Sequence, residues 1–88
     1  MDSKIKIHEL KLNEYFCDAV LSGEKTFEVR ENDRGYQKGD HIRFTPVDSF
    51  GLKVYRYSKL EDKEYEITYV LNGHGINEGY VVFSFKEV

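Results

Sequence analysis

The sequence has little of several residue types. It contains one cysteine, Cys17, one proline, Pro46, and no tryptophan in 88 residues. A lone cysteine excludes an internal disulfide framework and a zinc site built from cysteines. No apolar run approaches the ~20 residues that a membrane-spanning helix needs. Basic residues are not in excess, and a net charge of −3 argues against a protein that coats duplex nucleic acid. Any nucleic-acid contact must therefore depend on a local site.

The length of the chain and its first residues set further bounds. A chain of 88 residues allows one modest core, and no break in composition divides it, so we expect a single domain over residues 1–88. Residues 1–4 lack the apolar segment of a signal peptide. Together with the single cysteine, this predicts a cytoplasmic protein.

Aromatic residues are abundant, with seven Tyr and six Phe. They favour β-structure, and their rings can fill a small core. Alternation of apolar and polar residues predicts strands, and the spacing of Phe16, Ala19 and Val20 predicts one amphipathic helix over residues 13–22. The predicted strands cover residues 4–7, 26–30, 41–45, 64–71 and 80–85, with residues 54–57 as a short sixth strand.

Residues with special backbone preferences mark the ends of these elements. Asn13 suits the N-cap of the helix, and Gly23 lies where the residue after a helix is often glycine. Pro46 limits the strand over 41–45 to a sheet edge or a strand end. Polar turns at 31–35 and 37–40, a hairpin turn at 61–63 and a glycine-rich loop at 72–79 separate the strands.

The alternation also predicts which side chains share a face. Near the N-terminus the apolar positions shift to Leu10 and Leu12 after residues 8–9, which indicates a bulge or a strand end. The strand over 64–71 places four apolar side chains on one face, namely Tyr65, Ile67, Tyr69 and Leu71.

Short sequential strands separated by turns favour an antiparallel, curled sheet or a small barrel capped by the helix. The predicted fold class is therefore α+β, mostly β, with about five or six strands and one main helix.

The densest polar segment is residues 23–30, with the sequence GEKTFEVR. Gly23 ends the predicted helix, and Lys25 lies in the helix-to-strand connection. Phe27 and Val29 share one strand face, whereas Thr26, Glu28 and Arg30 share the other, the last two roughly 7 Å apart by the rise of a strand. Such a group can bind a base edge and neutralise a phosphate. The alternative is an ion pair on a solvated strand face.

The segment matches the pattern G-x-K-x-x-E-x-R and resembles the ASCH superfamily of PUA-like domains. The resemblance extends to residues 8–11, 15–22, 32–34, 38–40 and 79–82. Essentially the whole chain resembles a small ASCH/PUA-like domain of unknown function found in phages and Gram-positive bacteria. The resemblance implies a small PUA-like β-barrel with a cleft between helix and sheet that binds RNA or a nucleotide-like ligand.

The resemblance also implies which residues bind. Lys25 would contact phosphate or base, Arg30 would contact phosphate, and Glu28 would accept hydrogen bonds. Three further candidates in similar stretches are His8, Lys11 and Arg34. Tyr80 opens the last predicted strand after a glycine, where it could stack on a base or pack in the sheet.

An enzymatic function stays open as the alternative. Some ASCH relatives resemble small amidohydrolases that act on acylated cytidine through a Lys, a Thr and a Glu, and others resemble ribonucleases. The catalytic candidates would be Lys25, Thr26 and Glu28. In the amidase pattern the threonine follows the lysine by three residues, where this chain has Glu28. Thr26 is adjacent to Lys25, and adjacent residues on a strand point to opposite faces. The later glutamate of the amidase pattern has no clear counterpart in this chain, and Glu64 and Glu66 are only guesses. A binding role is therefore preferred over catalysis.

Other titratable residues predict no further chemistry. His8, His41 and His74 are far apart without metal-ligand spacing, so no metal site is expected, and no cofactor is implied. Cys17, in the middle of the helix, is expected to be a small buried residue. The expected partner is RNA or a nucleotide-like ligand, with no membrane contact. Edge strands make a homodimer possible, and the acidic charge would also suit a protein-interaction module for a basic partner.

Overall fold

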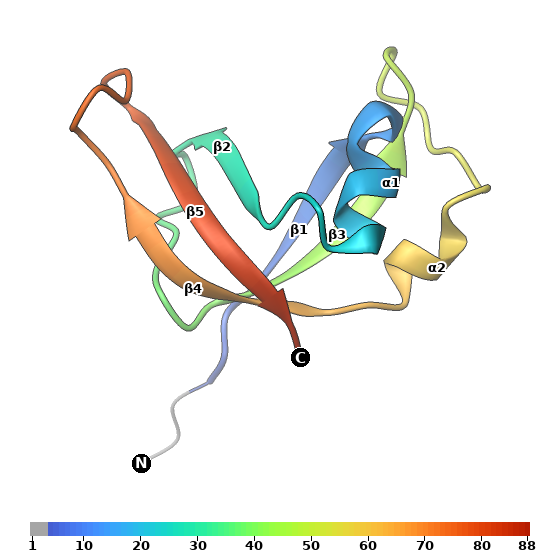
Figure 1. Cartoon of the computed structure of the whole chain (residues 1–88), viewed down its shortest axis with the longest axis horizontal. Coiled ribbons are helices and arrows are strands. Elements are labelled where there is room, and N and C mark those ends of the chain that lie inside the picture. The colour runs from blue at the N-terminus through green and yellow to red at the C-terminus, as the bar shows by residue number, and fades with distance from the viewer. Residues whose placement is uncertain (1–3) are drawn as a thin grey trace.

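The computed structural model describes residues 4–88, so residues 1–3 of the predicted domain lie outside the described residues. It contains five strands and two helices, which Figure 1 shows. In chain order the elements are β1 (Ile7–Asn13), α1 (Glu14–Ser22), β2 (Phe27–Glu31), β3 (His41–Val47), α2 (Ser58–Glu61), β4 (Tyr65–Leu71) and β5 (Tyr80–Glu87). The predicted mostly-β class with one main helix is confirmed.

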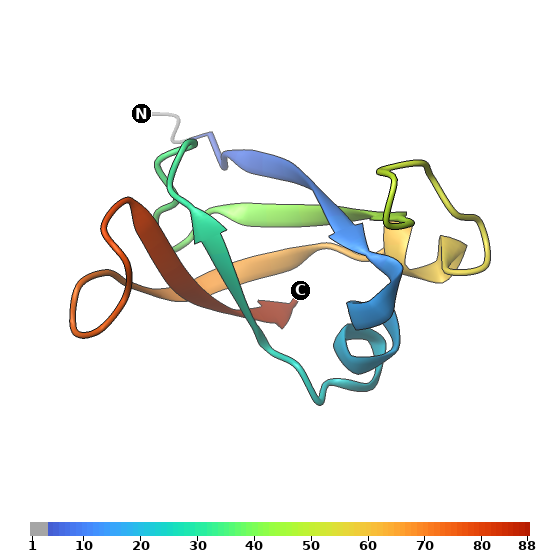
Figure 2. The same cartoon turned by 90° about the horizontal axis from the view of Figure 1, so that it is seen from above.

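The strands form one sheet in the order β1-β3-β4-β5-β2. The sheet curls into a half-barrel, and its edge strands β1 and β2 do not pair over residues 4–88, so the barrel is not closed (Figures 1 and 2). The prediction of an all-antiparallel sheet is wrong for one pair, because β1 and β3 run parallel. The chain passes through α1 and β2 between these two strands, and such a crossover is what parallel pairing requires.

The core fills the inside of the half-barrel. Alternate residues of each strand point inward, and α1 and α2 add further apolar side chains. The largest inward side chains of β3, β4 and β5 are Phe44, Tyr65, Phe83 and Phe85, and the rings of Tyr65 and Phe85 meet edge to face at 5.1 Å. None of the helices in residues 4–88 is long and apolar enough to cross a membrane.

Helix α1 has the predicted ends. The Asn13 side chain accepts a hydrogen bond from the Tyr15 backbone N–H at 2.9 Å, as an N-cap does. Gly23 follows the helix with a φ of 81°, a left-handed conformation that glycine adopts without strain. Cys17 is buried in the core, as predicted, whereas Phe16 stays partly exposed.

Strand β1 differs from the prediction. The strand begins at Ile7 and runs without interruption to Asn13, so neither the strand over 4–7 nor the bulge after residues 8–9 exists. The inward residues are His8, Leu10 and Leu12, whereas Ile7 is exposed. Inward and outward residues therefore alternate without a break along β1 once His8 is counted as inward. The buried His8 ring is hydrogen-bonded to Asp40.

The segment between β3 and β4 was also predicted incorrectly. Residues 54–57 form no strand, and the turn at 61–63 follows α2 instead of joining two strands. Asp48 folds the loop back by accepting hydrogen bonds from the backbone N–H groups of Phe50 and Leu52, both at 2.9 Å. Pro46 lies inside β3, but β4 pairs only with the first two residues of that strand, so the proline removes no bond of the β3–β4 ladder.

A bulge changes the faces of β4. The pairing with β5 is irregular between Ile67 and Tyr69, so the predicted shared face is wrong in its second half. Tyr65 and Ile67 point into the core, but Tyr69 is exposed and Val70 packs against the core instead. One extra residue in a strand shifts every later side chain to the other face.

Candidate functional site

The connection between α1 and β2 brings the charged segment next to the end of the helix. Gly23 reverses the chain, and the Lys25 backbone N–H then donates to the carbonyl of Ala19 at 2.9 Å. Strand β2 begins only at Phe27. Lys25 and Thr26 therefore lie in a turn that is fixed against the helix.

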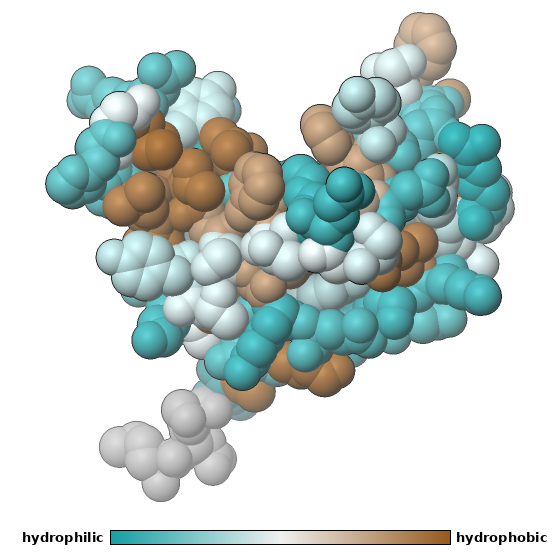
Figure 3. All heavy atoms as spheres, viewed as in Figure 1, coloured by the Kyte–Doolittle hydropathy of each residue, from teal (hydrophilic) through white to brown (hydrophobic). Residues whose placement is uncertain are grey.

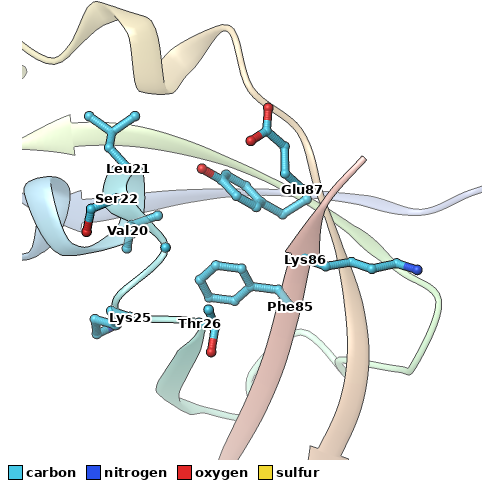
Figure 4. A pocket seen from close by; sticks show the side chains of 10 residues that line it. Val20, Leu21, Ser22, Lys25, Thr26, Phe85, Lys86 and Glu87 are labelled. Carbon is cyan, nitrogen blue, oxygen red and sulfur yellow. The ribbon is translucent and has the colours of Figure 1, made fainter.

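A cavity of about 270 Å³ opens between this turn and the sheet, as Figure 4 shows. Helix α1 and the turn contribute one side, and the ends of β4 and β5 contribute the other. The lining residues are Val20, Leu21, Ser22 and Gly23, then Lys25 and Thr26, and from the sheet Tyr65, Phe85, Lys86 and Glu87. Apolar walls with a few polar groups are typical of small-ligand sites.

Both motif residues of the turn line this cavity. The rule that adjacent residues of a strand point to opposite faces does not apply to Lys25 and Thr26, because β2 begins only at Phe27. Tyr65 and Glu87 also line the cavity, and sequence reasoning did not select them as site residues. The alternation of β4 does place Tyr65 inward, but nothing in the sequence indicates that the distant residue Glu87 lies beside it as its partner across β4 and β5.

Lys25, Glu28 and Arg30 form one ion cluster behind the cavity wall. The Lys25 ammonium pairs with Glu28 Oε2, and the Arg30 Nε donates to Glu28 Oε1 at 2.9 Å. Glu28 is only 5% exposed, so the charged face of β2 points inward, whereas Phe27 and Val29 face solvent. A buried carboxylate requires such partners, because an unpaired charge is costly away from water.

Two aromatic rings hold the Lys25 side chain. Its ammonium lies 5.0 Å from the centroid of the Phe16 ring and 5.1 Å from that of Phe27, within the range of cation–π attraction. The ammonium also donates to the Phe27 carbonyl at 2.7 Å. Lys25 is therefore fixed between the helix and β2.

Arginine side chains bridge the open side of the half-barrel. The Arg30 Nη2 donates to the Lys11 carbonyl at 2.8 Å, and the Arg34 Nη1 donates to the Glu9 carbonyl at 3.2 Å. Both carbonyls belong to β1, an edge strand whose backbone acceptors need partners. Lys11 contributes its backbone here, and its side chain is exposed. Three of the predicted binding residues, Lys11, Arg30 and Arg34, thus lie along the seam between β1 and β2.

The other two candidates lie apart from the cavity. The His8 Nε2 is 2.8 Å from Asp40 Oδ2, and the His8 ring packs against Tyr36 with centroids 4.7 Å apart, inside the core. Tyr80 lines a separate hollow of about 410 Å³ together with Val29, Ile76 and Val82. Figure 3 shows apolar side chains gathered on the side of the molecule formed by β2 and β5. The structure therefore does not bring His8 or Tyr80 together with Lys25.

Burial raises the pKa of two further side chains, Cys17 and Tyr65. Burial, and to a lesser degree Asp18 and Glu14, raise the pKa of the Cys17 thiol to about 11, which makes it a poor nucleophile. Burial and the nearby Glu87 carboxylate raise the pKa of Tyr65. Across residues 4–88, no three His, Cys, Asp or Glu side chains gather as metal ligands do.

Comparison with known proteins places the chain in a family. The model of the family described as "Domain of unknown function (DUF3850)" matches residues 7–85. The chain belongs to this family. A relative in Escherichia phage P2, named "Uncharacterized 12.9 kDa protein in GpA 3'region", is 51% identical over 37 residues. The aligned part is 42% of this chain and 34% of the phage protein, so the chain spans about a third of the length of that relative.

Proposed function

We propose that this domain binds RNA or a nucleotide-like ligand in the cavity between α1 and the sheet. The observation that carries the proposal is the composition of the cavity: Lys25 and Thr26 from the charged segment face it together with the aromatic residues Tyr65 and Phe85. Tyr65 and Phe85 are 4% and 5% exposed, so the small exposed parts of their rings form an apolar wall against which a flat ligand can pack. The volume of about 270 Å³ lies just below the roughly 300–1,000 Å³ of small-ligand pockets, so the cavity suits a ligand no larger than one nucleoside-sized unit.

The proposal includes a relationship to the ASCH superfamily. Two features support it: the G-x-K-x-x-E-x-R pattern over residues 23–30, and a curled half-barrel with its helix beside the cavity. On this proposal the DUF3850 family is a branch of PUA-like domains. The ion cluster of Lys25, Glu28 and Arg30 then supports the wall of the site, and Lys25 is the member that reaches the cavity.

The test is binding of short fluorescein-labelled single-stranded RNAs, followed by anisotropy, with nucleosides and nucleotides titrated by calorimetry. Lys25→Met should weaken binding by about tenfold, which corresponds to 1.4 kcal/mol. Lys59→Met, on α2 and away from the cavity, is the matched control and should leave the affinity unchanged. Arg30 is unsuitable for this test because it bridges β1 and β2. Equal affinities of the wild-type protein and the Lys25→Met and Thr26→Val variants would move the site elsewhere.

Hydrolysis of a modified nucleoside or of RNA is the second candidate function. The shared cavity of Lys25, Thr26 and Glu87 favours it, since it brings a lysine, a threonine and a glutamate together. Against it, Lys25 acts as an ammonium donor toward Glu28, and an ammonium cannot accept a proton from a threonine hydroxyl. Incubation with N4-acetylcytidine or with labelled RNA tests the candidate. Product formation that Thr26→Val abolishes would establish catalysis, and no turnover at high protein concentration would remove it.

A further inference from the structure

The cavity has little free positive charge. Of the two cations that line it, Lys25 is paired with Glu28, and Figure 4 shows that the Lys86 side chain points away from the cavity. The carboxylate of Glu87 lies on the sheet side, and the C-terminal end of α1 adds a partial negative charge on the other. A phosphate placed here would find no uncompensated cation.

The Tyr65 hydroxyl has unused hydrogen-bonding capacity. Tyr65 is 4% exposed and lines the cavity, and among residues 4–88 its hydroxyl makes no hydrogen bond. The hydroxyl oxygen itself is not among the fully buried side-chain atoms, so a tyrosine hydroxyl that lines the cavity without a protein partner is open to a hydrogen bond with a ligand. Burial and Glu87 favour the protonated form, so the hydroxyl can donate.

Glu87 supplies an acceptor beside this donor. Glu87 and Tyr65 are register partners across β5 and β4, which places them next to each other at the end of the sheet. The Lys63 ammonium donates to Glu87 Oε2 at 3.0 Å, and this pair holds the carboxylate in place. The second carboxylate oxygen can accept from a ligand. One end of the cavity thus presents a donor and an acceptor next to the apolar ring of Phe85.

A nucleobase edge has the complementary arrangement. On the Watson–Crick edge of every base a hydrogen-bond donor stands beside an acceptor, and single-stranded RNA is read through this edge together with stacking on aromatic rings. We infer that the cavity binds the base of a nucleoside or of an unpaired nucleotide, with Tyr65 donating to it and Glu87 accepting from it, while the phosphate remains outside. The inference depends on the proposed function and names the part of the ligand that the cavity recognises.

The experiment compares nucleosides with their 5′-monophosphates and with inorganic phosphate by calorimetry at low and high salt. At least one nucleoside should bind as tightly as its monophosphate, with little dependence on salt, because no phosphate is neutralised. Methylation of the recognised edge, as in 3-methyluridine compared with uridine, should weaken binding by about tenfold or more.

Two conservative variants test the named residues. Tyr65→Phe removes only the hydroxyl and Glu87→Gln only the charge, and each should weaken nucleoside binding by about five- to tenfold. The matched controls are Tyr69→Phe and Glu66→Gln, which lie on β4 and do not line the cavity, and they should bind as the wild-type protein does. Thermal unfolding of each variant separates lost contacts from lost structure.

The outcomes distinguish this inference from the proposed function. The inference is overturned if monophosphates or inorganic phosphate bind at least about tenfold more tightly than nucleosides and if their affinity falls as the salt concentration rises. Nucleotide binding itself would then remain in place. Nucleoside binding unaffected by both Tyr65→Phe and Glu87→Gln would overturn the inference as well. If neither nucleosides nor nucleotides nor RNA bind, the proposed function itself fails.

Discussion

Replacing Glu28 with alanine removes the carboxylate that two cations share. Both oxygens of Glu28 are used, one by Lys25 and one by Arg30, and its side chain is only 6% exposed. Without it, two positive charges face each other across the space that the carboxylate occupied. Arg30 also loses the contact that orients it toward the Lys11 carbonyl on β1, so the bridge across the open side of the half-barrel is weakened.

The expected cost lies between two limits. Removing one partner of a fully buried ion pair costs about 3–5 kcal/mol, and removing one partner of an exposed pair costs about 0–1 kcal/mol. The side chains of Lys25 and Arg30 are 16% and 23% exposed, so water can partly solvate them after the substitution. We therefore expect Glu28→Ala to lower the free energy of unfolding by about 2–3 kcal/mol. For a domain of this size, each 1 kcal/mol lowers Tm by about 4–8 °C.

Urea denaturation followed by tyrosine fluorescence measures this cost, since the chain has seven Tyr and no Trp. Glu31→Ala is the matched control, because Glu31 is an exposed glutamate on the same strand and should change stability by less than about 0.5 kcal/mol. A loss below about 1 kcal/mol in Glu28→Ala, similar to that of Glu31→Ala, would refute the view that the cluster holds β2 in place.

Two further predictions concern titratable groups. Hydrogen bonds from His41 and Arg43 hold the pKa of Glu64 below its ordinary value of 4.5. These contacts therefore stabilise the fold above pH 4.5, and their contribution is lost as the pH falls through the folded-state pKa of Glu64. Urea denaturation between about pH 6 and 3 should therefore show a flatter pH dependence for Glu64→Gln than for the wild-type protein, and identical slopes would contradict this. Because burial raises the pKa of Cys17 to about 11, the native thiol should react with a thiol reagent at neutral pH far more slowly than the unfolded chain, and equal rates would show that the helix does not shield it.

Local signals in the sequence were sufficient for most of the secondary structure. Asn13 and Gly23 locate the ends of α1 because their side-chain and backbone preferences act within a few residues. The strands over 41–45, 64–71 and 80–85 correspond to β3, β4 and β5, with ends that differ by a few residues. The composition of residues 23–30 is enough to mark this segment as chemically distinct. The error in β1 arose because a polar residue is satisfied from far away, as His8 is by Asp40.

The site was only partly predictable for the same reason. The pattern selects Lys25, Glu28 and Arg30, but it does not show that Lys25 faces a cavity while Glu28 lies buried and Arg30 bridges to β1. These roles depend on which strand lies across the open side of the sheet. The bulge in β4 and the parallel pairing of β1 with β3 likewise result from contacts between distant segments.

The sequence by itself determined the mostly-β class, the single main helix and the charged segment at its end, because capping, alternation and composition act over short stretches of chain. Only the tertiary structure decided that the sheet stays open, that arginine side chains span its two edges, and that Tyr65 and Glu87 meet Lys25 and Thr26 at one cavity. The physical reason is that these arrangements depend on strand register and on which charged side chains pair with one another. Both are settled by the packing of residues far apart in the chain.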